Sequence, residues 1–382
     1  MTRSTRRHMH GLTLAVVVGS LLVVPVSAHA ATCHSSGGQP RAGAGDAGAS
    51  SVAVVSPCVA WFVGSISNAM YDSRTLIERW NGTQWKTQPA PSPGDKTTLS
   101  GVAATSATNA WAVGVNSSSD THSHALIERW NGTSWTVQPS QNPGAHNTLV
   151  AVAALSDKNA WAVGFSSSPT VLGHTLIEHW NGAAWKLVAT PNPPSGDSET
   201  LSDVDIVSAN NVWAVGFAAT PFNSNDPLVL HWNGHKWSAT TLPAVGVVDD
   251  LRAVDAASAN DVWAVGSSEI TTTDQLIMHW NGIAWKHQKS PSPGHASELD
   301  GVVALSASDA WAVGWQQATR TSPLRTLLEH WDGTSWRVVA SPNPRAGYNA
   351  LTAVDADSPH DLWGVGTYSN GTSFRPLAFQ RQ

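Results

Sequence analysis

The sequence has 382 residues, of which 21 are Lys or Arg and 27 are Asp or Glu. A mildly acidic chain without a block of Lys or Arg argues against a nucleic-acid partner. It argues equally against adhesion to an anionic membrane, since both need basic surfaces. The 20 tryptophans are the unusual part of the composition, and their spacing predicts the fold.

The first 30 residues predict a secretory signal peptide. Three arginines lie within residues 1–7, an apolar run follows over residues 12–26, and Ala28-His29-Ala30 offers a cleavage site after Ala30. The run is too short for a membrane anchor and no second run of spanning length follows, so we expect an exported chain without membrane insertion. Thr5-Arg6-Arg7 also resembles a twin-arginine signal, which leaves the export route open. Removing three arginines lowers the 21 basic residues to 18 against 27 acidic ones, a formal charge of −9.

The chain has two cysteines, Cys33 and Cys58, both near the predicted mature N-terminus. Outside the cytoplasm such a pair is more often bonded than free, so we predict a disulfide. A lipid-modified Cys33 is the alternative, but the leucine that a lipoprotein signal carries three residues earlier is missing here.

Two tryptophan motifs repeat along the chain. Trp-x-Val-Gly begins at Trp61, Trp111, Trp161, Trp213, Trp263, Trp311 and Trp363. Trp-Asn/Asp-Gly-x-x-Trp follows each time, except at the C-terminus, and begins at Trp80, Trp130, Trp180, Trp232, Trp280 and Trp331. These motifs contain every tryptophan except Trp315, and a period of roughly 50 residues indicates a repeat architecture.

Each unit is predicted to form four short strands. The first is Leu-x-x-Val-x-Ala, the second contains Trp-x-Val-Gly, the third ends at the Trp of the second motif, and the fourth begins at its closing Trp. Asn-Gly between the third and fourth strands predicts a two-residue hairpin turn. In that register Trp80 pairs with Thr83 and Glu78 pairs with Trp85, so both tryptophans lie on one face.

The predicted fold is an all-β, seven-bladed β-propeller of four-stranded antiparallel blades, because a closed ring protects the sheet edges. The predicted segments are a signal peptide (residues 1–30), a flexible N-terminal segment (31–48) and the propeller (49–382). The last unit ends after its third strand. Either residues 31–49 supply the missing strand, or the ring closes through the disulfide and side-chain packing, and the sequence leaves this open.

The motifs resemble those of bacterial extracytoplasmic propellers related to the kelch/galactose-oxidase and Asp-box groups. Trp331-Asp332-Gly333-Thr334-Ser335-Trp336 is similar to a shortened Asp-box, and the resemblance covers nearly all of the predicted mature chain. The repeats lack the serine two residues before the Asp and the paired glycines of a kelch repeat. The resemblance implies the propeller architecture. These groups include sugar oxidases, sialidases, lectins and scaffolds, so it implies no single activity.

We place the candidate ligand site on the face that carries the loops between second and third strands, at the mouth of the central channel. These loops vary most, and one position six residues before the third-strand Trp carries hydrogen-bonding or charged side chains. The candidate ligand-binding residues are Arg74, His124, His174, Asp226, Asp274, Arg325 and Arg375, together with Trp315 as the tryptophan best placed for exposure. Solvated residues at a strand start are the alternative interpretation.

Other repeated polar residues are interpreted as structural. The position before the third-strand Trp holds Arg79, Arg129, His179, His231, His279 and His330. A group present in six units indicates a polar contact between blades, with the preceding Glu (Glu78, Glu128, Glu178, Glu329) as its partner. His122 and His124 could chelate a metal, but no third ligand is assigned nearby, so we expect no metal and no other cofactor.

No nucleophile elbow, phosphate-binding loop or Cys/His cluster occurs in the sequence, so no catalytic residue is assigned. The favoured function is a monomeric, non-enzymatic binding module for extracellular carbohydrate or protein. A secreted polysaccharide hydrolase or lyase is the alternative, and it requires an acid/base pair at the channel mouth. A structural repeat module without a small ligand is the third hypothesis.

Overall fold

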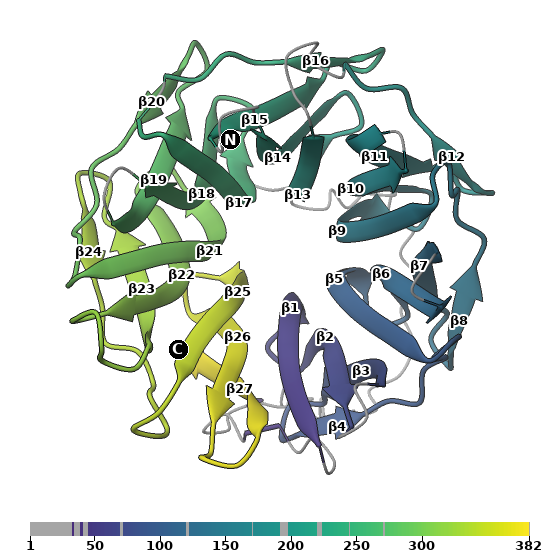
Figure 1. The fold of residues 1–382 in the computed structure, drawn as a ribbon, viewed down its shortest axis with the longest axis horizontal. Helices are drawn as coiled ribbons and strands as arrows, with labels where there is room; N and C mark the ends of the chain where they lie inside the picture. Colours follow the sequence, from purple (N-terminus) through teal and green to yellow (C-terminus); the bar gives the residue numbers. More distant parts are fainter. Residues whose placement is uncertain are drawn as a thin grey trace, which may run out of the picture.

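In a computed structural model of the protein, the described residues are 33, 39–40, 45–68, 72–119, 122–169, 171–191, 198–219, 224–243, 245–269 and 272–381. The predicted signal peptide, and most of the predicted N-terminal segment 31–48, lie outside them. The regular structure in these residues is entirely β-strand, and no helix suited to crossing a membrane occurs among them. The strands form a ring around a central opening (Figure 1). We call each run of strands that pair in sequence order a blade.

The first strand of each blade lies innermost, around the opening (Figure 1). In each of these strands the pairing with the second strand skips one residue just after the leucine of the Leu-x-x-Val-x-Ala pattern, or after Ala49 in β1. Such a β-bulge bends the strand and re-aims a side chain. The first strands are β1 (Asp46–Ser56), β5 (Lys96–Ser106), β9 (His146–Ser156), β13 (Ser198–Ser208), β17 (Val248–Ser258), β21 (Ala296–Ser306) and β25 (Asn349–Ser358).

The second strand carries the buried Trp-x-Val-Gly motif. Its glycine lies so close to the first strand that a Cβ at Gly164 would collide with the carbonyl oxygen of Thr148, which explains the glycine in the motif. The second strands are β2 (Val59–Ser67), β6 (Asn109–Ser119), β10 (Asn159–Ser168), β14 (Asn211–Ala219), β18 (Asp261–Glu269), β22 (Asp309–Gln317) and β26 (Asp361–Ser369).

The third strands pair antiparallel with the second strands and end the blade's buried part. They are β3 (Ser73–Trp80), β7 (His122–Trp130), β11 (Val171–Trp180), β15 (Asn225–Trp232), β19 (Thr273–Trp280), β23 (Arg325–Trp331) and β27 (Phe374–Arg381). The fourth strands are short and lie at the rim. They are β4 (Trp85–Thr87), β8 (Trp135–Gln138), β12 (Trp185–Leu187), β16 (Trp237–Ala239), β20 (Trp285–His287) and β24 (Trp336–Val338). Among the described residues, no fourth strand follows β27.

The predicted hairpin register is wrong by two residues. Trp80 lies opposite Trp85, and Glu78 lies opposite Thr87, so the loop has four residues instead of two. The reason is the Asn81 side chain, whose Oδ1 accepts hydrogen bonds from the backbone N–H groups of Thr83 (3.1 Å) and Gln84 (3.0 Å). Gly82 supplies the positive φ of 89° that the turn needs. The conclusion that both tryptophans share a face is unaffected.

Tryptophans from neighbouring blades hold the ring together. The second-strand Trp161 packs against both Trp232 and Trp237 of the next blade, with ring centroids 5.0 Å and 5.3 Å apart. The same three-ring contact closes the ring, because Trp363 of the last blade lies 5.0 Å from both Trp80 and Trp85 of the first. Tilted and edge-to-face geometry is favourable for aromatic pairs. The repeat therefore encodes contacts between blades as much as the blades themselves.

The repeated His residues contact their own blade, whereas Arg79 and Arg129 also donate hydrogen bonds to carbonyl oxygens of the next blade, as predicted. His179 stacks on Trp161 at 4.3 Å and hydrogen bonds Asn159 at 3.0 Å through Nε2. Arg129 lies over Trp111 and also reaches Trp180 of the next blade. The predicted pairing of these residues with the preceding Glu is wrong, because adjacent strand residues point to opposite faces.

Candidate functional site

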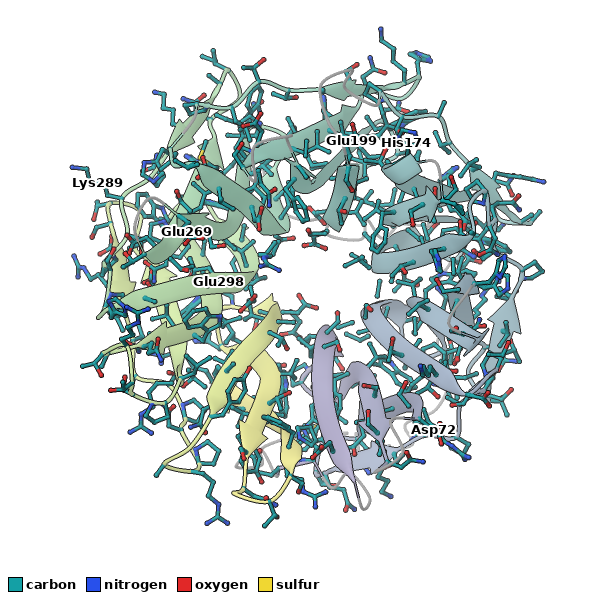
Figure 2. All side chains as sticks on the ribbon, viewed as in Figure 1. Asp72, His174, Glu199, Glu269, Lys289 and Glu298 are labelled. Atoms are coloured by element: carbon teal, nitrogen blue, oxygen red, sulfur yellow. A yellow bond between two sulfur atoms is a disulfide. The ribbon has the colours of Figure 1, made fainter. Side chains whose placement is uncertain are left out.

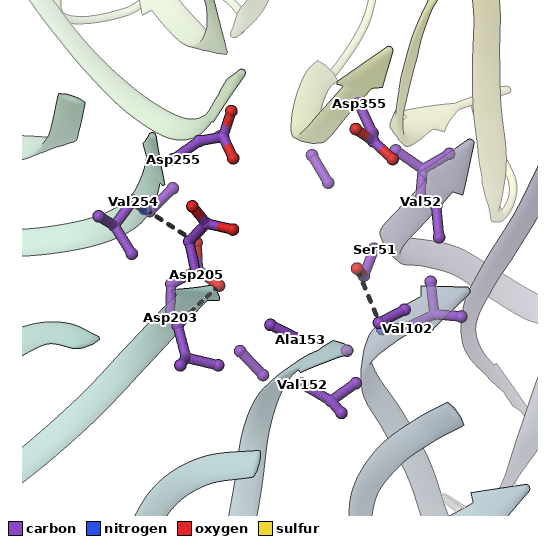
Figure 3. Close-up of a pocket in the computed structure, with 18 of the residues that line it drawn as sticks. Ser51, Val52, Val102, Val152, Ala153, Asp203, Asp205, Val254, Asp255 and Asp355 are labelled. Carbon is purple, nitrogen blue, oxygen red and sulfur yellow. Dashed lines mark hydrogen bonds between the residues drawn. The ribbon is translucent and has the colours of Figure 1, made fainter. Parts of the chain in front are cut away.

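A cavity of about 420 Å³ lies on the axis of the ring and is lined by the first strand of every blade. Residues that flank the buried valine of each first strand face this space, and Figure 3 shows several of them converging on it. The bulge after the leucine brings one further residue per strand into the lining, such as Arg252 in β17 and Asp300 in β21. The wall therefore includes polar positions, such as Ser51 and Asp203, that take no part in the tryptophan-containing core.

The two halves of the cavity wall differ in chemistry. The half formed by β1, β5 and β9 has small or apolar side chains, such as Ser51, Gly101 and Ala153. The half formed by β13, β17, β21 and β25 has the charged ones. Those charged residues are Asp203, Asp205, Arg252, Asp255, Asp300 and Asp355.

Four of the aspartates brace neighbouring first strands. A first strand's inner edge has no further strand to pair with, so its N–H groups need other acceptors. Asp203 accepts the N–H of Val254 at 2.9 Å, and Asp355 accepts the N–H of Val54 at 2.7 Å across the closing point of the ring. Ser51 does the same for Val102 at 3.2 Å (Figure 3). The other two bracing aspartates are Asp205, to Ala256 N at 3.1 Å, and Asp255, to Ala304 N at 2.6 Å.

Burial raises the pKa of Asp203 to about 7, although two backbone hydrogen bonds counteract it. A carboxyl group inside the narrow channel loses part of the hydration of its charged form, and this outweighs the two N–H donors. The braces are consequently polar groups held by the fold, and they leave Asp300 as the aspartate of the wall whose hydrogen bond goes to another side chain.

Asp300 belongs to a charged group shared by β17 and β21. Arg252 Nη2 lies 3.0 Å from Glu298 Oε1, and Glu298 is hydrogen bonded to Asp300. Burial, followed by the charge of Glu298, raises the pKa of Asp300 to about 8, and burial also raises the pKa of Glu298. Two carboxyl groups in such contact share one proton at neutral pH, because both cannot ionise side by side. The pair thus presents one hydrogen-bond donor and several acceptors next to a guanidinium.

Two aromatic residues accompany this group. Trp315 is the cross-strand partner of Glu298 in the β21–β22 ladder, so both side chains lie on the same face, and Trp315 is half-buried. Tyr348 directly precedes β25, and burial together with the charges of Asp300 and Glu298 raises its pKa. Its ring contacts that of Phe374 edge-on at 5.5 Å. Trp315 lies within β22 and not in the loop that follows it, and it is only half exposed.

The structure does not bring the predicted ligand-binding positions together at the channel. Arg74, Asp226 and their equivalents lie at or near the start of third strands, two strands away from the axis, and none lines the cavity. Most of these side chains are exposed. His174 contacts Glu199 at 3.4 Å, as Figure 2 shows. Arg325 and Arg375 donate to the carbonyl oxygens of Arg345 and Gly45. As ligand contacts outside the channel these positions remain a prediction.

The sequence did not lead us to predict Arg252, Glu298 or Asp300 as site residues. Glu298 is labelled on β21 in Figure 2. A signal was present. The two variable positions after the leucine are Ser100-Gly101 in one unit but Asp300-Gly301 in another, and Arg252-Ala253 in a third. These departures from the repeat lie inside first strands and not in the variable loops between second and third strands. Among the described residues, no group of three or more His, Cys, Asp or Glu side chains is arranged to hold a metal ion.

No known protein family and no curated protein matches the sequence. Solved structures match the fold. YCF48 bound to a D1 peptide has 12% identity and a TM-score of 0.54 over 89% of this chain and 95% of its own. YCF48 from Cyanidioschyzon merolae has 14% identity and a TM-score of 0.54 over 89% of this chain and 97% of its own.

An ulvan lyase, a polysaccharide lyase bound to a saccharide, has 10% identity and a TM-score of 0.56 over 88% of this chain and 95% of its own. At such identities the likeness concerns the fold alone. Together with the repeated antiparallel sheets and the tryptophan contacts, it makes this chain an all-β propeller.

Proposed function

We propose that this chain is an exported seven-bladed propeller that binds extracellular carbohydrate or protein without catalysis, at the mouth of its central cavity. The observation that carries the proposal is the one-sided wall of that cavity, where Arg252 and Asp300, both in contact with the buried Glu298 behind the lining, lie opposite small side chains. Residues 49–382 form the propeller in this proposal, after a signal peptide that is removed behind Ala30.

The position of the charged group supports binding from the loop face. Each first strand enters the ring from the face that carries the loops between second and third strands. Glu298 and Asp300 lie in the first half of β21, and so nearer to that face than the bracing Asp255 and Asp355 lie in their strands. The opposite wall of Ser51, Gly101 and Ala153 leaves room for a ligand.

The chemistry of the group suits a ligand rich in hydroxyl or amide groups. The Arg252 guanidinium donates, the carboxyl pair both donates and accepts, and the side chains of Trp315 and Tyr348 add apolar surface with a polar end. Binding sites commonly combine a concave surface with a few such polar groups. The solved propellers include one described as bound to a peptide and one as bound to a saccharide, which is compatible with either ligand class.

The proposal is tested by a glycan array and a pull-down from cell-envelope fractions, with wild type and two matched variants. Asp300→Asn changes the cavity, whereas Asp226→Asn changes an exposed residue of the predicted outer ring. We expect Asp300→Asn to weaken binding about tenfold or more and Asp226→Asn to leave it unchanged. The reverse pattern would move the site to the outer ring, and silence of the wild type in both assays would favour a structural module.

A second candidate, a polysaccharide-cleaving enzyme, is favoured by one observation, the Glu298–Asp300 carboxyl pair. A neutral and an ionised carboxyl side by side can give and accept a proton. A direct hydrogen bond is, however, shorter than the roughly 5–9.5 Å that separates the carboxyl groups of glycoside hydrolases, so the pair suits a lyase better. Incubation with polysaccharides distinguishes the two functions. New unsaturated ends that vanish with Glu298→Gln would establish an enzyme.

A further inference from the structure

The outer edge of β27 is the one third-strand edge, among the described residues, that no fourth strand covers. In other blades the residue that follows the end of the fourth strand donates its N–H to the third strand. Val188 N lies 2.9 Å from Ile177 O, and Val339 N lies 2.8 Å from Leu328 O. Ala378 occupies the equivalent place in β27, because it pairs with Val365 as Ile177 pairs with Val163.

The side chain of Gln39 takes the place of the missing strand. Its Nε2 donates to the carbonyl oxygen of Ala378 at 2.9 Å, and its Oε1 accepts the N–H of Ala378 at 3.3 Å. A carboxamide has the same donor and acceptor as a peptide group, so one side chain bonds both the N–H and the carbonyl oxygen of Ala378. Among the described residues before β1, it is this side chain that covers the edge of β27.

Two further N–H positions on the edge of β27 are accounted for. The N–H of Phe374 is bound by Asp46 Oδ1 at 2.8 Å, and Pro376, the next residue that faces outward, has no N–H to satisfy. Arg375 donates to the carbonyl oxygen of Gly45 at 3.3 Å. Gln39, Gly45 and Asp46 therefore contact the last blade at two separate positions along β27.

A covalent bond attaches the same segment to the first blade. Cys33 forms a disulfide with Cys58, which lies in the turn between β1 and β2, and their Cα atoms are 5.4 Å apart. Cys33 precedes Gln39 by six residues, and β1 begins at Asp46, seven residues after Gln39. The chain from Cys33 to Asp46 thus starts on the first blade, contacts the last blade through Gln39, and returns to the first blade.

We propose that this segment, which we call the latch (Cys33, Gln39, Gly45 and Asp46), closes the ring in a redox-dependent way. With the disulfide formed, Gln39 is confined near β27 and its carboxamide completes the last blade. Reduction of the disulfide removes that confinement, and Ala378 loses its partners. The latch is distinct from the proposed ligand site and does not depend on it.

The redox step is a thiol–disulfide exchange. A dithiol reductant gives two electrons and two protons to the Cys33–Cys58 bond and becomes a disulfide itself, and the reverse exchange with a disulfide oxidant closes the latch. A chain in a reducing compartment would therefore have an open latch, and one in an oxidising compartment a closed one.

The test is hydrogen exchange of the Ala378 amide in the native protein, before and after reduction with dithiothreitol. We expect reduction to accelerate exchange at Ala378 at least tenfold, while the equivalent Ile177 amide in the β9–β12 blade stays unchanged. Gln39→Ala in the oxidised protein should accelerate Ala378 roughly fivefold, because it removes one side-chain hydrogen-bond pair. Gln88→Ala is the matched control, since the side-chain contacts of Gln88 are with carbonyl oxygens of its own strand.

Two results would overturn the proposal. If Ala378 exchanges equally fast in oxidised wild type and in Gln39→Ala, the carboxamide does not complete the blade. If reduction leaves Ala378 protected although mass spectrometry shows free thiols, closure is independent of the disulfide. Because reduction is applied to the folded protein, the test requires no cysteine substitution that could prevent folding.

Discussion

Two junctions between neighbouring blades show how the same repeat can be completed in different ways. At the first, Trp161 of β10 packs against Trp232 and Trp237 of the next blade. At the second, Trp311 of β22 faces the last blade, which has neither of these tryptophans, and Arg381 lies over its ring at 4.8 Å. In both cases a stacked His covers the other side of the second-strand Trp, at 4.3 Å for His179 and 4.1 Å for His330.

The difference teaches that each second-strand Trp depends on the blade that follows it. Trp161 is 1% exposed and Trp311 is 6% exposed. Arg381 therefore shields Trp311 from water nearly as well as the indoles of Trp232 and Trp237 shield Trp161. A guanidinium over an indole is worth less than two buried aromatic rings. The junction at Trp311 should therefore be less stable than the junction at Trp161. The latch adds its bonds in the same last blade.

The largest expected effect comes from removing the tryptophan at each junction. Trp161→Ala should lower the free energy of unfolding by about 4 kcal/mol, since it leaves a large cavity among three rings. Trp311→Ala should cost about 2 kcal/mol, because fewer aromatic contacts are lost. Urea unfolding measures both, and an equal or larger loss for Trp311→Ala would contradict the comparison.

A second contrast between junctions concerns buried glutamates. Glu178 accepts hydrogen bonds from Ser140 Oγ at 2.6 Å and from the N–H of Gln141 at 3.1 Å, both in the linker of the preceding blade. Glu128 stands one repeat earlier, where Ala90 and Pro91 replace those two donors. Its side chain is fully buried, neither carboxyl oxygen has a hydrogen-bond partner, and burial raises its pKa to about 8.

This raised pKa predicts a pH dependence of stability. The unfolded chain loses the Glu128 proton near the ordinary pKa of 4.5, whereas the folded chain keeps it up to about 8. The contribution of Glu128 to the free energy of unfolding is therefore complete below pH 4.5 and decreases as the pH rises to 8. We expect a loss of roughly 4 kcal/mol over that range, reduced in Glu128→Gln. Urea midpoints measured from pH 5 to 9 check this, and a rise in stability with pH would refute it.

Restoring the missing donor should have a smaller effect of the opposite sign. Ala90→Ser places a hydroxyl where Ser140 and Ser290 bind Glu178 and Glu329 one and four repeats further on. We expect Ala90→Ser to stabilise the protein by about 1 kcal/mol at pH 8 and by less at pH 5, where Glu128 is protonated. Ala154→Ser, at a half-buried alanine of another blade, is a control that should gain nothing.

The smallest expected effect concerns the cation at the last junction. Arg381→Gln should cost about 0.5–1 kcal/mol, the range of a cation–π contact that is partly exposed to water. Arg381→Lys should recover part of that loss, because it restores the charge without the planar group. Thermal unfolding at low and moderate salt checks both variants, and a stabilising Arg381→Gln would show that the cation contributes nothing.

Most of the fold could be predicted from the sequence because its periodicity is strong. The tryptophan motifs place the strands, and Trp363 with Trp80 and Trp85 close the ring as the motif spacing indicates. The hairpin register could not be obtained from Asn-Gly alone, because the Asn81 side chain competes as an acceptor for two backbone N–H groups.

The candidate site was less accessible to prediction, for a physical reason. Arg252 and Asp300 follow a leucine in a strand that looks regular, and only the bulge turns them toward the axis. Arg252 and Asp300 belong to neighbouring blades and lie 48 positions apart in the chain, so their contact is not evident from the sequence. The Gln39–Ala378 contact spans 339 residues and involves a side chain, so no strand pattern could predict it.

The bulge has a consequence for how such a protein can change. Each first strand exposes one extra residue toward the axis, and these seven positions carry Ser50, Ser100, Val150, Ser202, Arg252, Asp300 and Thr352. None belongs to the tryptophan contacts, so mutation there is uncoupled from folding to a large degree. A library randomised at these positions should consequently yield folded proteins with altered recognition, and the axis becomes a place where selection or design can act without first repairing the scaffold.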